Sequence, residues 1–183
     1  MLDRLTNWKS VLIIFLVAVV GFNVILFPWR SGRMQALAGR PVGIIDTMYA
    51  YTPDQVYEKI PVYGDEGRPF YALTEFTIDL VYPVLYNLFL ILTMTLVFRQ
   101  AFPGNSALHR LCFLPLAVWI SDYAENTCIV ILLLSYPQRL DALAWVSSFF
   151  STTKWSLGVA SLALIVIGLV VWWVKRIRVG GSR

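Results

Sequence analysis

The sequence predicts an all-α polytopic membrane protein, a four-transmembrane-helix bundle in which an extramembrane loop with a short interfacial helix joins helices 1 and 2. Of its 183 residues, 58% are hydrophobic and 14% are charged, and the mean hydropathy is +0.67. A soluble domain of this length needs more polar surface than such a chain supplies. The basic residues behind the net charge of +4 flank apolar stretches, which is typical of anchoring to lipid headgroups and excludes nucleic acid as a partner.

Several apolar stretches are long enough to cross a bilayer. We therefore predict that residues 1–183 form a single membrane domain. The predicted spans cover about residues 11–27, 72–98, 111–135 and 143–174, and the outer loop covers residues 28–71. The first span also resembles a secretory signal, because "ALA" at 36–38 matches a cleavage site. The length of the apolar run, and Arg30 and Arg33 before that site, favour an uncleaved span.

The basic residues also predict an orientation. An even number of spans places both termini on one side of the membrane. The cluster "VKRIR" directly after the last span favours cytoplasmic termini in the plasma (inner) membrane. Arg30 and Arg33, which follow the first span, argue for the opposite orientation.

The outer loop carries signals for a short helix and a turn. In "TPDQVYEKIP", Thr52 is the expected N-cap, Pro53 the first helical residue and Pro61 the end of the helix. Gly64 and Gly67 then predict a tight turn before the second span. Five tyrosines make this segment amphipathic: Tyr49, Tyr51, Tyr57, Tyr63 and Tyr71. They predict a lid against the outer membrane face, or alternatively an interfacial loop with ordinary belt aromatics.

The third span, within "FLPLAVWISDYAENTCIVILLL", carries Asp122, Glu125 and Asn126 near its middle. Helical spacing puts these side chains on one face. Because a charged side chain at mid-bilayer costs about 2.5–3.5 kcal/mol, we expect that face to look into a protein-lined or watery interior.

Polar residues of the other spans fall at a similar depth. Counted at about 1.5 Å per residue from the basic residue at the inner end of each span, Asp122 and Glu125 lie at about 18 and 22 Å. By the same count Tyr86 and Asn23 lie at about 20 and 21 Å, and Asp79 and Lys154 at about 30 Å. Single helical faces carry Glu75, Asp79, Tyr82 and Tyr86 on the second span, and Ser147, Ser151, Lys154, Gly158 and Ser161 on the fourth.

These residues define a candidate ligand-binding pocket: Asp122, Glu125, Asn126, Asp79, Tyr82, Tyr86, Lys154 and Asn23. Asp122, Glu125 and Lys154 form its expected charge network, with Asp79 near the mouth. Alternatively, Lys154 snorkels to the outer headgroups beside Trp155, and Asp79 pairs with Arg68. Catalytic residues remain unassigned, because the sequence has no phosphate loop, nucleophile elbow or histidine pair.

If a metal binds, its ligands are all oxygen, with Asp122 and Glu125 first among them. Such a set suits a divalent cation such as magnesium, calcium or manganese and does not suit zinc.

The sequence therefore predicts an outward-opening acidic pocket that binds a small cationic or amphipathic, lipid-like ligand. One alternative is a lipid-modifying membrane enzyme that uses Asp122 and Glu125 as an acid–base pair or metal ligands, with Tyr86 as a donor. Another is a structural subunit whose polar faces mate with a membrane partner. A transport role predicts a homo-oligomer, because four spans are few for a transporter.

Overall fold

The computed structural model describes residues 7–180 and is all-helical over that range, without a strand. Four helical stretches are long and apolar enough to cross a membrane. They are Trp8–Ala38, Pro53–Ala101, Ser106–Ser135 and Asp141–Arg178. The predicted all-helical class and the presence of four such stretches are thereby confirmed.

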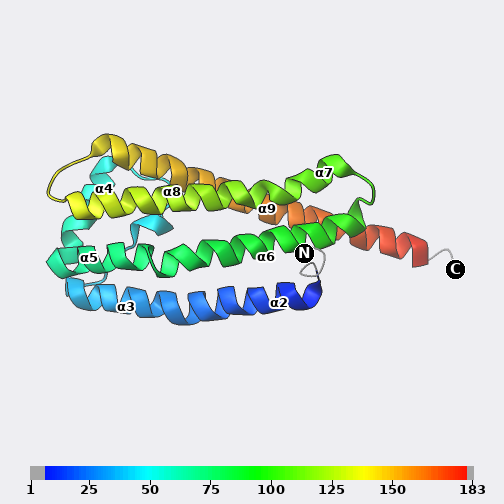
Figure 1. Ribbon diagram of the computed structural model, residues 1–183, viewed down its shortest axis with the longest axis horizontal. Helices are drawn as coiled ribbons and strands as arrows, with labels where there is room; N and C mark the ends of the chain where they lie inside the picture. Colours follow the sequence, from blue (N-terminus) through cyan, green and yellow to red (C-terminus); the bar gives the residue numbers. More distant parts are fainter. Residues whose placement is uncertain (1–6, 181–183) are drawn as a thin grey trace.

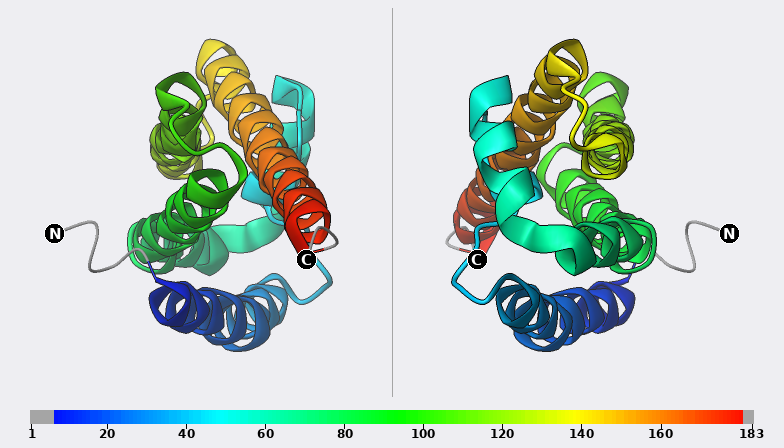
Figure 2. Two further views of the ribbon diagram at one scale, coloured as in Figure 1. Left: turned by 90° about the vertical axis from the view of Figure 1, so that its right-hand side faces the viewer. Right: turned by 90° about the vertical axis from the view of Figure 1, so that its left-hand side faces the viewer.

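The long helices run side by side along the longest axis of the molecule (Figure 1). The first stretch consists of α2 (Trp8–Leu16), a π-helical segment η1 (Val17–Leu26) and α3 (Phe27–Ala38). Viewed from either end, it forms a layer of its own beneath the other helices (Figure 2). It packs along α5 (Gly64–Glu75) and α6 (Ile78–Ala101). The first helix is therefore the peripheral member of the bundle.

The centre of the bundle is built by α6, α8 (Leu114–Ser135) and α9 (Asp141–Gly180). A short α7 (Ser106–Arg110) and a 3-10 turn η4 (Leu111–Phe113) lead from α6 into α8. One core cluster joins Met94, Val97 and Phe98 of α6 to Ile165 of α9. Gly168 lets α9 approach α6 closely, since a Cβ there would lie 2.6 Å from Cγ1 of Val97.

The connection between the first two stretches is more helical than the sequence predicts. It holds a 3-10 turn η2 (Ile45–Thr47), α4 (Pro53–Lys59) and a second 3-10 turn η3 (Ile60–Tyr63) before α5. Thr52 caps α4 in a reciprocal capping box with Gln55, as its sequence indicates. Pro61 does not end the helical path, because it lies inside η3. Gly64 makes the expected turn with a φ of 71°, whereas Gly67 lies within α5.

The structure corrects two expectations about residues 28–71. The first helix does not end at Phe27 but continues to Ala38. Pro28 lies inside this continuous helical path, directly after the π-helical segment η1, where the regular helical hydrogen-bond pattern is already interrupted. The tyrosines do not form a surface lid either. All but Tyr49 are buried, and Tyr51, Tyr57, Tyr63 and Tyr71 belong to one core cluster with Ile129, Leu132 and Leu133 of α8.

We predict that Gly168→Ala destabilises the bundle and Gly158→Ala does not. The new methyl group at Gly168 would collide with Val97, whereas at Gly158 it would meet nothing within 4 Å. We expect a loss of about 1–3 kcal/mol for the first variant and a gain of about 0.5–1 kcal/mol for the second. Thermal unfolding of the purified variants in detergent measures both. Equal midpoints for the two variants would contradict the close approach of α9 to α6.

Candidate functional site

Buried polar side chains from α3, η2, α5, α6, α8 and α9 meet in the half of the bundle that carries α4 and α5. They form two ion-pair clusters. The Arg30 cluster contains Arg30, Asp46, Glu75 and Asp79. The Lys154 cluster contains Lys154, Asp122 and Glu125. We refer to these seven residues together as the charged network.

In the Arg30 cluster, a single guanidinium group contacts three carboxyl groups. Arg30 Nη2 lies 3.1 Å from Oδ2 of Asp46, and Nη1 lies 3.4 Å from Oε1 of Glu75. Nη1 also contacts Oδ2 of Asp79. The guanidinium carbon lies 5.2 Å from the centre of the Phe27 ring and 5.7 Å from that of Tyr71. Arg30 thereby ties the first helix to α5, to α6 and to the connection before α4.

In the Lys154 cluster, an ammonium group bridges two carboxyl groups of α8. Lys154 Nζ lies 3.0 Å from Oδ1 of Asp122 and 2.7 Å from Oε2 of Glu125. Each carboxyl group also accepts a hydrogen bond from a tyrosine hydroxyl group. Tyr86 donates to Oδ2 of Asp122 at 2.7 Å, and Tyr51 donates to Oε1 of Glu125 at 3.1 Å. Lys154 therefore points into the bundle and does not snorkel outward.

Asn126 joins the two clusters. In the amide orientation that satisfies its neighbours, Nδ2 donates to Oε2 of Glu75 and to the main-chain carbonyl of Asp122, both at 3.2 Å. Glu75 belongs to the Arg30 cluster and Asp122 to the Lys154 cluster. The charged network is therefore continuous across the bundle.

Serines of α9 fix Tyr51 at the network. The Tyr51 hydroxyl lies 2.6 Å from Oγ of Ser147, and its main-chain N–H donates to Oγ of Ser148 at 2.9 Å. Ser151 donates to the main-chain carbonyl of Met48 at 2.5 Å. Burial, and the nearby charge of Glu125, raise the pKa of Tyr51 well above its usual range. The phenol therefore stays protonated and acts as a donor.

The structure brings most of the sequence-predicted pocket residues together. Within hydrogen-bond or ion-pair distance of the network, or in it, lie Asp79, Tyr86, Asp122, Glu125, Asn126 and Lys154. Asn23 and Tyr82 lie beside it: Asn23 Nδ2 donates to the Tyr82 hydroxyl at 3.2 Å, and Tyr82 packs on Tyr86 with ring centroids 5.1 Å apart. Asp79 pairs with Arg30, and Arg68 contacts Asp65 instead.

Sequence reasoning left out four residues that the structure places at the site. The position of Glu75 could have been predicted, because it is four residues from Asp79 and so lies on the same helical face. Arg30 falls in the predicted outer loop, residues 28–71, and so outside the predicted spans. Asp46 lies in a three-residue 3-10 turn and Tyr51 in an irregular segment, and neither is long enough for periodicity to indicate what the side chain faces.

The network has more acidic than basic groups. Five carboxyl groups and two cationic groups give a formal charge of −5 + 2 = −3 when every group is ionised. Each of these side chains is at most 11% exposed. Buried charge without a partner is costly, so protons or a further cation must compensate part of this excess.

Two carboxyl groupings bear on the prediction of a metal. Asp122 and Glu125, the first-named metal ligands, are already bridged by the Lys154 ammonium group. Asp46, Glu75 and Asp79 each offer an oxygen within 4.8 Å of the others, but the Arg30 guanidinium contacts all three. A divalent cation in either place would have to displace a basic side chain.

A lateral recess of about 470 Å³ lies beside residues that neighbour the network in sequence. It is lined by Thr47, Tyr49, Trp155, Ser156 and Val159. Thr47 follows Asp46 in the chain and Trp155 follows Lys154. Asp46 and Lys154 have the most exposed side chains of the network, at 11% each. Two of the residues that line the recess are thus the sequence neighbours of the two most exposed network side chains.

Comparisons with protein-family models, with curated proteins and with solved structures gave no match. A functional assignment therefore depends on the geometry of the site.

We predict that Arg30→Met destabilises the fold strongly, because it leaves three buried carboxyl groups without their shared partner. Removing one side of a buried ion pair costs about 3–5 kcal/mol. Urea or SDS unfolding in mixed micelles measures the loss. Arg33→Met, at an exposed position one turn away, serves as the control and should stay within about 0.5 kcal/mol of wild type. Adding Asp79→Asn to Arg30→Met should recover part of the loss; no recovery would contradict the ion-pair account.

A second prediction concerns the tyrosines. Tyr51→Phe removes the donor to Glu125 and the contact with Ser147, both buried, and should cost about 1–3 kcal/mol. The Tyr49 hydroxyl also forms a hydrogen bond, with Ser156, but Tyr49 is 56% exposed. Tyr49→Phe should therefore lower the free energy of unfolding by less than about 0.5 kcal/mol. The same unfolding assay compares them, and equal losses would refute a special role for Tyr51.

Proposed function

We propose that the protein is an integral membrane protein whose charged network binds a cationic group, either a small cation or the cationic headgroup of an amphipathic ligand. The observation that carries this proposal is the acidic excess of the network, five carboxyl groups against two basic side chains. A ligand cation placed there would compensate charge that the protein leaves unbalanced.

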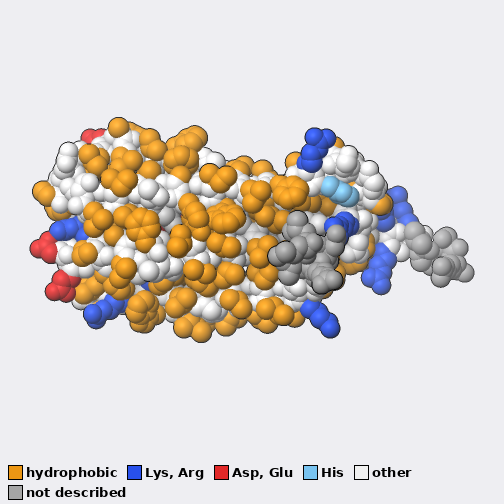
Figure 3. All heavy atoms as spheres, in the orientation of Figure 1, with side chains coloured by type: hydrophobic (Ala, Val, Ile, Leu, Met, Phe, Trp, Pro, Cys, Tyr) orange, Lys and Arg blue, Asp and Glu red, His pale blue; other side chains and the backbone are white. Residues whose placement is uncertain are grey.

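The surface supports membrane insertion. Hydrophobic side chains cover the middle of the face shown in Figure 3, while Lys, Arg, Asp and Glu gather toward the two ends. Large apolar side chains are exposed on the long helices, among them Ile13, Val24, Ile120, Val159 and Val166, each more than half exposed. Water disfavours so much exposed apolar surface, whereas lipid accepts it.

Charge asymmetry supports cytoplasmic termini. The end of the bundle that holds the start of α2 and the end of α9 carries only basic charges within residues 7–180: Lys9, Arg99, Arg110, Lys175, Arg176 and Arg178. Every carboxyl group of that range lies in the network or at the opposite end. An excess of Lys and Arg on one side is the usual mark of the cytoplasmic side.

The lateral recess favours an amphipathic ligand. Trp155, Tyr49 and Val159 line it with apolar surface, and all three are exposed. An apolar chain lying in this recess would bring a cationic headgroup to the side of the network where Asp46 and Lys154 are most accessible. In this arrangement the ligand arrives from the membrane plane through the outer half of the bundle.

The two alternative functions have less support. As an acid–base pair of a lipid-modifying enzyme, Asp122 and Glu125 would first have to leave the Lys154 ammonium group. As a structural subunit, the protein would need polar faces free for a partner. Asp122, Glu125 and Asn126 are instead satisfied inside the chain.

We predict that the purified protein retains a long-chain primary amine in preference to the alcohol of equal chain length. Native mass spectrometry from detergent measures this retention with hexadecylamine and hexadecanol as probes. Asp46→Asn should weaken amine binding about tenfold, because one charged contact of about 1.4 kcal/mol is lost. The fold should persist, since Arg30 keeps Glu75 and Asp79.

Glu66→Gln is the matched control, because Glu66 is an exposed carboxyl group at the same end of the bundle. It should retain the amine like wild type. Equal retention of amine and alcohol, or equal loss in both variants, would refute the proposed cation site. The same spectra, together with elemental analysis for magnesium, calcium and manganese, would show whether the cation is instead a divalent metal.

A further inference from the structure

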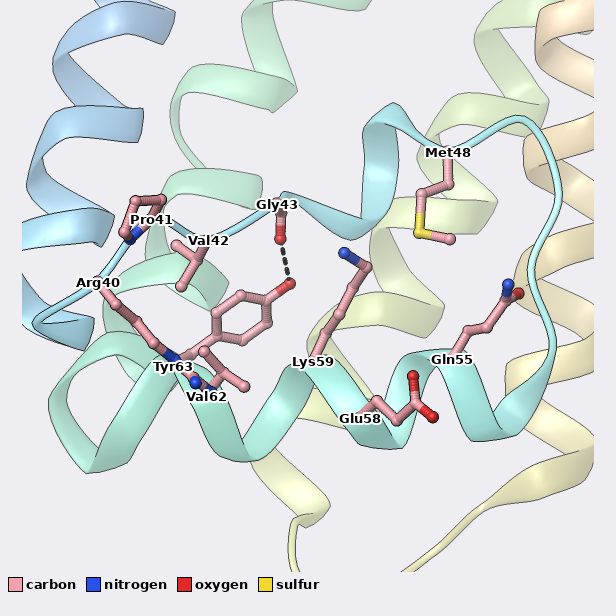
Figure 4. Close-up of a pocket in the computed structure, with 10 residues that line it drawn as sticks. All are labelled: Arg40, Pro41, Val42, Gly43, Met48, Gln55, Glu58, Lys59, Val62 and Tyr63. Carbon is pink, nitrogen blue, oxygen red and sulfur yellow. Dashed lines mark hydrogen bonds between the residues drawn. The ribbon is translucent and has the colours of Figure 1, made fainter.

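A second cavity, which we call the end pocket, opens at the end of the bundle that carries α4 and differs in charge from the network. Its volume is about 500 Å³. It lies between α4 with η3 on one side and the chain from Arg40 to Met48 on the other (Figure 4). It is lined by Arg40, Pro41, Val42, Gly43, Met48, Gln55, Glu58, Lys59, Val62 and Tyr63.

Two basic side chains reach this pocket from opposite walls. Lys59 rises from α4, and its ammonium group points toward the chain between Gly43 and Met48 (Figure 4). A Cβ at Gly43 would lie 2.9 Å from Lys59 Nζ, so the glycine leaves room for the ammonium group. Arg40 starts from the other wall, and its side chain runs toward Val62 and Tyr63, so that the Tyr63 ring lies between it and the Lys59 ammonium group (Figure 4).

Within the part of the chain that the structure describes, neither of these cationic side chains makes a hydrogen bond. Among the ion pairs of residues 7–180, none involves Arg40 or Lys59. Glu58, the acidic side chain of the lining, makes no ion pair with them either, and the lining has a formal charge of 2 − 1 = +1. Arg30 and Lys154, by contrast, contact three and two carboxyl groups.

We propose that the end pocket binds a phosphate-bearing anion, with Lys59 as its direct charged contact and Arg40 adding positive charge to the same pocket. Lysine and arginine are the usual phosphate ligands, the first as a point charge and the second through its planar fork. Val42, Met48 and Val62 add an apolar wall suited to the glycerol and first methylenes of a lipid. The pocket lies at the end of the apolar spans, where lipid phosphates sit in a bilayer.

Contacts made by Tyr63, one of the lining residues, connect the end pocket to the charged network. The Tyr63 hydroxyl donates to the carbonyl of Gly43 at 2.8 Å, and the Tyr63 ring packs edge-on against Tyr71 with centroids 5.4 Å apart. The Tyr71 hydroxyl accepts the main-chain N–H of Ile45 at 3.0 Å. An anion that braces the chain between Arg40 and Met48 would thus also steady Asp46, which lies in η2. This site goes beyond the cation-binding proposal and does not depend on it.

Two probes separate the sources of the phosphate group. Wild-type protein in detergent is titrated with phosphatidylglycerol, with phosphatidylcholine as the lipid control and with inorganic phosphate alone, and bound molecules are counted by native mass spectrometry. We expect phosphatidylglycerol to be retained over phosphatidylcholine. Competition by inorganic phosphate would assign the pocket to a free anion, and retention without competition would assign it to a lipid headgroup.

Matched variants test the residues. Lys59→Gln and Arg33→Gln each remove one positive charge near the same end of the bundle, but only Lys59 lines the pocket. Lys59→Gln should weaken anion binding about tenfold, and Lys59→Arg should restore most of it. Arg33→Gln should leave binding within about twofold of wild type. No binding of either anion by wild type, or equal loss in Lys59→Gln and Arg33→Gln, would overturn the proposal. Amine retention, measured in parallel, reports on the network separately.

Discussion

The constraint on which the rest of the structure depends is that charged groups in an apolar bundle must find their partners within the chain. Arg30 meets three carboxyl groups and Lys154 meets two. These pairs draw α3, η2, α5, α6, α8 and α9 to one place, and Asn126 holds the two clusters together. Because buried ion pairs gain little net energy over apolar packing, such a network specifies an arrangement more than it adds stability.

The connection between the first two helices follows from the same constraint. Asp46 and Tyr51 could not reach the network from a loop lying flat on a membrane surface. The segment instead turns inward, where Ser148 and Ser151 of α9 bind its main chain and its tyrosines pack against α8. These two serines of α9 therefore provide hydrogen-bond partners for main-chain groups of Met48 and Tyr51, which lie in a segment without regular structure.

Helical periodicity predicted what lies within single helices and missed what depends on contacts between distant segments. Asp122, Glu125 and Asn126 could be placed on an inward face because their spacing follows the helical repeat. Arg30 could not, because a proline such as Pro28 ends a helix in most contexts, whereas here the helical path continues through it. The partners of Asp79 were ambiguous for a related reason: Arg68 is nearer in sequence, but the contact with Arg30 spans the whole connection between the helices.

The peripheral position of the first helix bears on how the chain would be assembled in a membrane. Arg30 of this helix is synthesised before Asp46, Glu75 and Asp79, the carboxyl groups that it contacts. Until those residues arrive, a positive charge near the end of a long apolar helix would stay in the headgroup layer. In a membrane, the N-terminal helix would therefore reach its final position only after α5 and the first turn of α6 had been synthesised.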